Sequence, residues 1–431
     1  MAGASAALTP PAFDRLRTAA PLFAVIICAA IVLGLLLPLS DSFPWWLLAL
    51  VALGFLGVRL ATPRPEQLDD ALWPLVAGIC TLSILAVARL NPALGRHQAI
   101  WMAVGLAIVI AGQRLFLRYR DLEKVKYLWV AASLSLFVLL QFFGHEVNGA
   151  RLWFSFGQFE VQPVEIVKLF MVFFMAAYLA ENGAKIGALA PTDLATNSRL
   201  LAPLVLGWGV SIISLVLQRD VGMAGLFLGI FLVMLYAASR RVDLVCIAAA
   251  VFALGALFVA SHFAYVQARI AVWHDPWSDP LGRGYQAEQA LFSLASGGLF
   301  GTGYHLGHPG FIPDAPTDYV YAAWAEEFGV AGALALLALY LALVVRGMRI
   351  AFYAPDRFTS LLATGFAATL GIQVFVIVAG VLGLLPLTGI TLPFFSYGGS
   401  SMVANIIMLN LLWLFSRREG DLQPAGKVGS S

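Results

Sequence analysis

Long apolar bands alternate with short polar segments along most of the chain. A helix needs about 20 mainly apolar residues to cross the hydrocarbon core of a bilayer. The pattern therefore predicts about twelve transmembrane helices. The bands at 45–61 and 202–217 are marginal in length, so a count of ten or eleven spans stays open. The twelve bands lie near residues 20–39, 45–61, 72–89, 98–116, 126–143, 164–181, 202–217, 221–238, 242–260, 326–346, 358–383 and 401–416.

The composition agrees with this pattern. Of the 431 residues, 61% are hydrophobic and only 12% are charged, and the mean hydropathy is +0.86. These values exclude a soluble domain and indicate an all-α polytopic membrane protein. The net charge of +2 is too small to indicate binding to nucleic acid.

The basic residues are distributed unequally between the two sides of the predicted bundle. If the amino terminus lies inside, 19 of the 26 Lys and Arg residues fall in inner segments, six fall in outer segments, and Lys168 lies within a span. Cytoplasmic loops of membrane proteins carry such an excess of Lys and Arg. We therefore expect a multi-pass protein with both termini in the cytoplasm.

Two charged residues stand inside an apolar band. Glu165 and Lys168 follow Gln162-Pro163 and are three residues apart, so they share one helix face. Each charge in the hydrocarbon costs at least roughly 2.5–3.5 kcal/mol on insertion scales. The sequence leaves two interpretations open: the pair joins helices, or it faces a polar cavity in which a charged ligand is handled.

Three outer segments are longer or more polar than a connection requires. They are residues 144–162, a large loop at 262–325, and a Gly- and Pro-rich turn at 383–401. In the large loop, helical spacing of apolar residues predicts a short interfacial helix from Gln286 to Leu299. The glycine cluster at 297–303 follows no predicted strand and does not match a nucleotide-binding loop. Residues 417–431 are polar and are expected to form a disordered cytoplasmic tail.

Histidine and cysteine give no sign of a metal site or a disulfide framework. The six histidines are scattered over outer segments without metal-ligand spacing. The three cysteines, Cys28, Cys80 and Cys246, all fall in predicted spans. No metal site is predicted, although a requirement for a divalent cation stays open.

Charged residues of both signs gather near the predicted outer surface. The cations are Arg151, Lys168 and Arg269, and the carboxylates are Glu165, Asp220, Asp318 and Glu326. Arginine and lysine suit phosphate or pyrophosphate, and a nearby carboxylate suits a general base acting on a hydroxyl. A lipid-linked phosphosugar would meet both, with its tail in the bilayer. The alternative is that these charges form structural ion pairs around irregular loops.

Ten motifs in order resemble the SEDS family (shape, elongation, division and sporulation), which includes RodA, FtsW and SpoVE. The resemblance covers about residues 72–416 and implies a ten-helix core, to which residues 1–71 add two helices. This sequence departs from the usual motifs at Val164, Arg219, Met223 and Pro316. The matching stretches are Gly149–Trp153, Gln162–Lys168, Gln218–Ala224, Arg269–Pro276, Asp279–Gln286, Ser296–Gly303, Pro316–Tyr319, Ala325–Gly329, Leu384–Gly389 and Pro393–Ser401.

The resemblance implies a peptidoglycan glycosyltransferase that polymerises lipid II at the outer face of the bacterial cytoplasmic membrane. Asp318 matches the essential aspartate of the family and would deprotonate the attacking sugar hydroxyl, while undecaprenyl pyrophosphate leaves with inversion at the anomeric carbon. The resemblance also implies a class B penicillin-binding protein, a transpeptidase, as partner.

The other site residues are assigned by the same resemblance. Lys168, Arg151 and Arg269 would offset the diphosphate charge, and Glu165 would orient Lys168. Trp153 would pack on lipid or sugar, or belong to an interfacial aromatic belt. Further predicted substrate-binding residues are Gln286, Thr317 and Ser400, and predicted structural or accessory residues are Asp220 and Glu326.

Two other functions remain open on the sequence. A flippase for lipid-linked precursors would use the same cations but would need no base at Asp318. A non-catalytic scaffold of the cell-wall synthesis complex is compatible with the altered motifs. The sequence does not decide between roles in elongation, division and sporulation.

Overall fold

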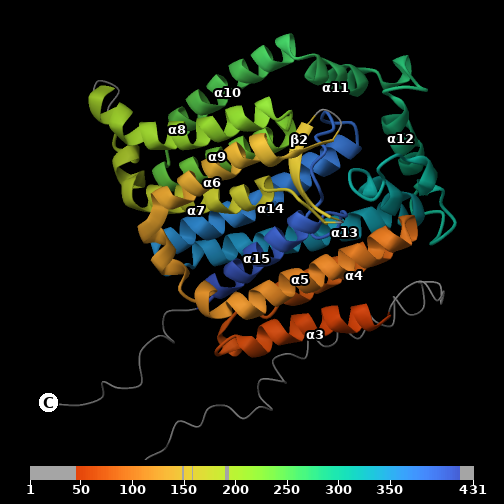
Figure 1. Cartoon of the computed structure of the whole chain (residues 1–431), viewed down its shortest axis with the longest axis horizontal. Helices are drawn as coiled ribbons and strands as arrows, with labels where there is room; N and C mark the ends of the chain where they lie inside the picture. The colour runs from red at the N-terminus through yellow and green to blue at the C-terminus, as the bar shows by residue number, and fades with distance from the viewer. Residues whose placement is uncertain (1–44, 148–149, 158, 190–193, 418–431) are drawn as a thin grey trace, which may run out of the picture.

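The computed structural model describes residues 45–147, 150–157, 159–189 and 194–417. Within these ranges the chain forms a bundle of long helices that lie side by side (Figure 1). Three features of the sequence analysis fall outside the described residues: the first predicted span at 20–39, Cys28, and nearly all of the predicted tail. The helices of the bundle are α3 (Trp45–Ala61), α4 (Leu72–Leu90), α5 (Pro92–Phe116), α6 (Lys126–Phe143), α7 (Val164–Gly187), α8 (Leu194–Leu217), α9 (Val221–Ser239), α10 (Val242–His262), α13 (Val320–Phe352), α14 (Arg357–Val381) and α15 (Gly399–Phe415).

Each of the eleven predicted bands in the described part of the chain forms one of these helices, including the two marginal bands. Eight helical stretches there are long and apolar enough to cross a membrane, and α3 and α15 are shorter apolar helices. In hydrocarbon the backbone must satisfy its own polar groups, which a helix does within one segment. The prediction of an all-α polytopic membrane protein is confirmed.

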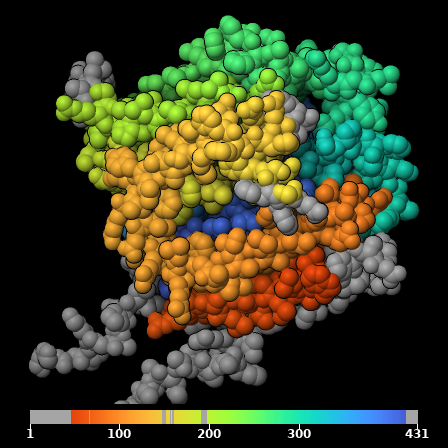
Figure 2. Space-filling view, viewed as in Figure 1, coloured from red at the N-terminus to blue at the C-terminus, as the bar shows by residue number. Residues whose placement is uncertain are grey.

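The centre of the bundle is formed by α7, α14 and α15. Helix α7 packs against α6, α9 and α14, and α15 packs against α5. Most side chains of these three central helices are buried, including Phe174, Phe366 and Trp413. On the face drawn in Figure 2, the blue C-terminal residues are visible in a hollow between orange and yellow segments.

Helix α10 differs from the central helices because none of its residues is buried. It packs only against α9 and α11 (Ala264–His274) among the stronger contacts, and it lies along one edge of the bundle (Figure 1). Its side chains are almost entirely apolar, so the helix is suited to face lipid over most of its circumference.

Several helix boundaries have clear local causes. Asn91 caps α5, and Pro92 occupies the first turn, where its missing N–H costs nothing. The carboxylate of Asp356 accepts the backbone N–H of Thr359 and caps α14 in the same way. Helix α13 is interrupted at Gly329, whose φ of 67° lies in the left-handed region that glycine adopts readily.

The outer segments contain structure that the sequence analysis did not predict. Three short segments form an antiparallel sheet in the order β1-β2-β3, and these strands are β1 (His145–Val147), β2 (Ala150–Phe156) and β3 (Phe159–Val161). The large loop contains α11 and also α12 (Tyr285–Gly297), which corresponds to the predicted interfacial helix. The strands were missed because β1 and β3 have only three residues each, and the seven residues of β2 do not alternate strictly between polar and apolar.

Candidate active site

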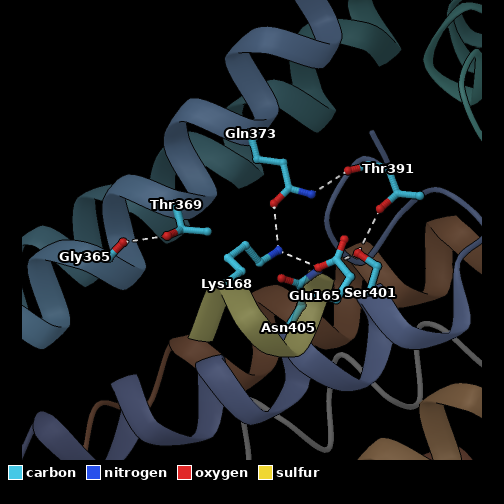
Figure 3. Close-up of polar contacts among 8 residues, drawn as sticks. All are labelled: Glu165, Lys168, Gly365, Thr369, Gln373, Thr391, Ser401 and Asn405. Carbon is cyan, nitrogen blue, oxygen red and sulfur yellow. Dashed lines mark hydrogen bonds and ion pairs between the residues drawn. The ribbon is translucent and has the colours of Figure 1, made fainter. Parts of the chain in front are cut away.

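The charges inside α7 form a buried ion pair (Figure 3). The ammonium Nζ of Lys168 lies 2.6 Å from Glu165 Oε2, and it also donates to Gln373 Oε1 of α14 at 3.1 Å. Neither side chain of the ion pair is more than 2% exposed. A buried pair depends on further hydrogen bonds to offset its desolvation. Gln373 supplies such a bond to Lys168.

A chain of hydrogen bonds continues from this pair into the turn before α15. Gln373 Nε2 donates to the carbonyl of Thr391 at 2.8 Å. The Thr391 hydroxyl bonds to Ser401, whose hydroxyl also accepts from Asn405 at 3.2 Å. These contacts join α7, α14, α15 and the segment 382–398 (Figure 3). Lys168 is therefore linked to that segment through Gln373.

The loop before α13 holds Asp318 in a tight turn. The carbonyl of Asp314 accepts the backbone N–H groups of both Thr317 and Asp318 at 3.1 Å and the Thr317 hydroxyl at 3.0 Å. Asp314 itself has a φ of 52°, which aspartate tolerates better than most residues. The N–H of Tyr397 donates to the carbonyl of Pro316 at 2.8 Å. Segment 382–398 thus contacts the Asp318 loop directly.

Asp318 and Arg269 meet across Gly389. A Cβ atom added to Gly389 would lie 3.7 Å from Asp318 Oδ2 and 3.9 Å from Arg269 Nη2. Arg269 also donates from Nη1 to the carbonyl of Thr388 at 3.3 Å. The pKa of Asp318 is raised to about 6: burial is the main cause and the charge of Asp314 adds to it, whereas the Thr317 hydroxyl and Arg269 act in the opposite direction. This acid is poised to exchange a proton near neutral pH.

Asp220 lies at the same end of the bundle and is also linked to this turn. Its carboxylate caps α9 by accepting the N–H of Met223 at 3.0 Å. Gly222, in the first turn of α9, lies close to the carbonyl of Thr388. Burial raises the pKa of Asp220 to about 6, while the Met223 hydrogen bond and Arg269 lower it. Arg269 therefore acts electrostatically on both aspartates.

The remaining predicted residues occupy the surroundings of this cluster. Gln286 donates from Nε2 to the carbonyl of Pro313 at 2.8 Å, and Ser400 accepts the N–H of Gln162 at 2.8 Å. Glu326 is 4% exposed and accepts the N–H of His308 at 2.7 Å. These contacts hold the entrance to α7 and, at two points, the connection between α12 and α13 that carries Asp318.

Arg151 and Trp153 lie in β2 of the three-stranded sheet. The guanidinium of Arg151 pairs with Glu146 of β1 at 3.2 Å and donates to the carbonyl of Gln141 at 3.3 Å. Arg151 is exposed and Trp153 is half-buried. Contact of these residues with a substrate stays a prediction, as does contact of the buried Lys168 with a diphosphate.

Sequence reasoning missed several polar residues that the structure brings together. Gln373 and Asn405 are amide side chains inside predicted apolar bands, where Asn405 is accompanied by Asn410. An amide group inside an apolar band was the signal that these residues have buried partners. Arg89 was counted only as an outer charge, but its Nε lies 2.9 Å from Glu327 Oε1, and its Nη2 donates to the carbonyl of Gly307. The pair ties α4 to α13.

No group of three or more His, Cys, Asp and Glu side chains in the described ranges has an arrangement that could hold a metal ion. The cations of the site itself are Arg269 and, deeper in the bundle, Lys168. A requirement for a divalent cation stays open.

Comparison with known proteins identifies the family. The model of a cell cycle protein family that comprises FtsW, RodA and SpoVE matches residues 75–420. The chain belongs to the FtsW, RodA and SpoVE family. The resemblance found in the sequence is thereby confirmed, and the chain is a multi-pass membrane protein of this family.

Relatives and solved structures cover most of the chain. The peptidoglycan glycosyltransferase RodA of Mycobacterium tuberculosis is 37% identical over 95% of this chain and 92% of its own length. A chain in a peptidoglycan synthase complex, solved in a study of the coordination of polymerization and crosslinking, has a TM-score of 0.68 and 31% identity, and the match covers 83% of this chain and 99% of that one. The rod shape determining protein RodA of Thermus thermophilus gives a TM-score of 0.60 and 30% identity, with coverage of 81% and 97%.

Proposed function

We propose that this family member is a peptidoglycan glycosyltransferase that polymerises lipid II at the outer face of the bacterial cytoplasmic membrane. The names of its FtsW and RodA relatives support the reaction, and the bias of basic residues supports the sidedness. The likeness to a chain of a peptidoglycan synthase complex supports a class B penicillin-binding protein as partner.

The observation that carries the proposal is the position of Asp318 beside Arg269. The two side chains flank the small space above Gly389, and a side chain at that position would enter the space between them. A carboxylate whose pKa lies near 6 is ionised at neutral pH and is still basic enough to accept a proton. This pairing of a base with a cation fits a reaction that joins a hydroxyl to a phosphate-activated sugar.

In the proposed reaction, Asp318 accepts the proton of the attacking sugar hydroxyl. The oxygen forms a bond to the anomeric carbon of the growing chain, and the bond from that carbon to the diphosphate oxygen breaks. Undecaprenyl pyrophosphate leaves with the bonding electron pair, and the anomeric configuration inverts. Arg269 offsets the charge that develops on the diphosphate, an electrostatic effect typically worth a few kcal/mol.

Lys168 and Glu165 are proposed to serve the same site. Their ion pair supports Thr391 through Gln373, and the segment that contains Thr391 reaches the Asp318 loop through Tyr397. In this role Lys168 is a positioning residue that acts through its ion pair with Glu165 and its bond to Gln373. Thr317 and Gln286 hold the Asp318 loop, Ser400 holds the entrance to α7, and Arg151 and Trp153 are proposed to contact substrate at the outer surface.

The decisive experiment replaces Asp318 with Asn in the full chain, purified with a candidate class B transpeptidase and supplied with lipid II. We expect glycan polymer to disappear while lipid II binding persists. Asp314→Asn is the matched control, because Asp314 lies in the same turn, is exposed, and has a backbone conformation that asparagine also adopts.

Other results would lead to different functions. Polymer formation at the wild-type rate by Asp318→Asn would remove this residue from the mechanism. Translocation of lipid II in sealed vesicles without polymer would identify a flippase. If the wild-type chain neither polymerises nor translocates lipid II while the transpeptidase remains bound, the scaffold hypothesis is correct.

A further inference from the structure

A polar hollow lies at the other end of the bundle from Asp318. It has a volume of about 490 Å³ and forms where α7 and α9 end and α14 begins. Helix α13 starts next to Asp318 and ends shortly before α14 begins, so the two sites are separated by the length of a spanning helix. The bias of basic residues assigns this end to the cytoplasm.

Two glycines of α7 allow the helix ends to approach closely enough to form the hollow. A Cβ atom on Gly183 would lie 2.9 Å from Arg357 Nη2 and 3.0 Å from the carbonyl oxygen of Ala238. A Cβ atom on Gly187 would lie 2.9 Å from the carbonyl oxygen of Ser239. The walls are otherwise small residues, so the space is not filled by side chains.

The two charged residues that line the hollow are both arginines, Arg240 and Arg357. Arg357 donates one hydrogen bond, from Nη2 to the carbonyl of Ala238 at 2.7 Å, which leaves N–H groups of its guanidinium available. Arg240 caps the end of α9 in a left-handed conformation and is exposed. Both guanidinium groups can therefore turn toward an anion in the hollow.

Nearby groups of opposite charge already have partners. Asp243 is paired with Arg241, and Asp356 lies 3.2 Å from Arg120 and caps α14. Arg241 also donates to the carbonyl of Gly187 at 3.3 Å, so it neutralises part of the negative end of α7. The charged side chains that line the hollow are therefore both positive, and the nearby carboxylates of Asp243 and Asp356 are held by other arginines.

We propose that this hollow binds the phosphate group of an anionic phospholipid from the adjacent leaflet. Arginine binds phosphate oxygens through two parallel N–H groups, and basic pockets between helices at a cytoplasmic membrane surface are suited to lipid head groups. A volume of about 490 Å³ accommodates a glycerophosphate group. Its location at the shared ends of α7, α9 and α14 means that a bound lipid holds together three helices of the bundle.

The test measures thermal unfolding of the full chain in detergent, titrated with phosphatidylglycerol and, separately, with phosphatidylcholine. We expect phosphatidylglycerol to raise the melting temperature more than phosphatidylcholine does. Arg240→Asn should weaken the apparent affinity for phosphatidylglycerol about fivefold, which is the effect of one basic residue at an anionic lipid surface. Ala184→Trp, which fills the hollow and keeps both arginines, should abolish the difference between the two lipids.

Arg64→Asn is the matched control. Arg64 is also an exposed arginine with a left-handed backbone, φ 51° against 56° for Arg240, but it does not line the hollow. Equal effects of the two lipids on the wild type, or equal losses in Arg64→Asn and Arg240→Asn, would overturn the proposal. A rise of the melting temperature with glycerol 3-phosphate as large as that with phosphatidylglycerol would assign the hollow to a soluble phosphate compound instead.

Discussion

At the scale of single residues, the acids and bases of this protein fall into two environments. Asp318 and Asp220 lie outside the spanning segments, where burial raises their pKa values. Glu165 and Lys168 lie inside the bundle and neutralise each other at 2.6 Å. The first environment favours proton exchange near neutral pH, and the second favours a fixed geometry.

The raised pKa of Asp318 predicts an acid limit to polymerisation. Only the ionised carboxylate acts as a base, so the rate should fall as the pH drops through about 6, to about a tenth of its plateau at pH 5. The measurement is the initial rate of lipid II polymerisation between pH 5 and pH 8. Asp220→Asn serves as control, because Asp220 also has a pKa of about 6 and its removal should leave the profile unchanged. A rate independent of pH across this range would contradict a general base at Asp318.

Lys168→Ala should both destabilise the protein and slow polymerisation. The substitution leaves Glu165 buried without its cation, which typically costs about 3–5 kcal/mol. The double variant Glu165→Gln with Lys168→Met removes both charges and should recover most of the melting temperature. If Lys168 positions Thr391 through Gln373, polymerisation should stay low in the double variant. Recovery of both stability and rate would indicate that the pair only joins helices.

At the scale of elements, the segment 382–398 connects the two environments. It accepts a hydrogen bond from Gln373 at Thr391, donates one to the Asp318 loop at Tyr397, and places Gly389 between Asp318 and Arg269. Gly389 has a φ of 70°, which a residue with a side chain adopts only at a cost. The position therefore favours glycine for two reasons, backbone conformation and space.

Gly389→Val is expected to abolish most polymerisation because its side chain enters the space beside Asp318. Gly383→Val separates this effect from backbone strain: Gly383 has a similar φ of 73°, and nothing lies within 4 Å of a Cβ atom added there. Both variants should lose similar stability, on the order of 1–3 kcal/mol. Only Gly389→Val should lose activity, measured as the rate of lipid II polymerisation. Equal rates in the two variants would show that the space above Gly389 is not used by substrate.

At the scale of the whole molecule, the proposed function depends on the orientation of the bundle. Asp318, Arg269 and the outer sheet must face the outside, and the arginine-lined hollow must face the cytoplasm. The uneven distribution of Lys and Arg between the two ends gives the physical reason for this orientation. The orientation of the bundle therefore decides whether the site can bind lipid II that has been translocated to the outer leaflet.

Labelling of single cysteines should reveal this orientation. In a background in which Cys28, Cys80 and Cys246 are replaced by Ala, a membrane-impermeant maleimide should label His305→Cys in intact cells. Lys124→Cys, at the opposite end, should be labelled only after the membrane is made permeable. Both positions are accessible enough to react, since His305 is exposed in the connection before α13 and the Lys124 side chain is 77% exposed. Labelling of Lys124→Cys in intact cells would reverse the proposed topology.

The sequence predicted most of the fold because apolar length is a local property. A band long enough to cross a bilayer must form a helix, since no other single segment satisfies its backbone there. This holds for α8, although its band was marginal. The marginal band of α3 also formed a helix, although a shorter one, and amphipathic spacing predicted α12. The outer sheet was not predicted, because three short strands are stabilised by pairing with one another rather than by their own composition.

The candidate site could be predicted only in part from the sequence. Glu165 and Lys168 could be paired from their spacing on one helix, and family motifs singled out Asp318 and Arg269. Tertiary structure alone brought Gln373 to Lys168, across 205 positions of sequence, and brought Arg269 and Asp318 to either side of Gly389. Helical periodicity determines which face a residue occupies, but the packing of distant helices determines which residue lies opposite. For this protein the sequence set the membrane class and the charges, and packing decided which charges act together.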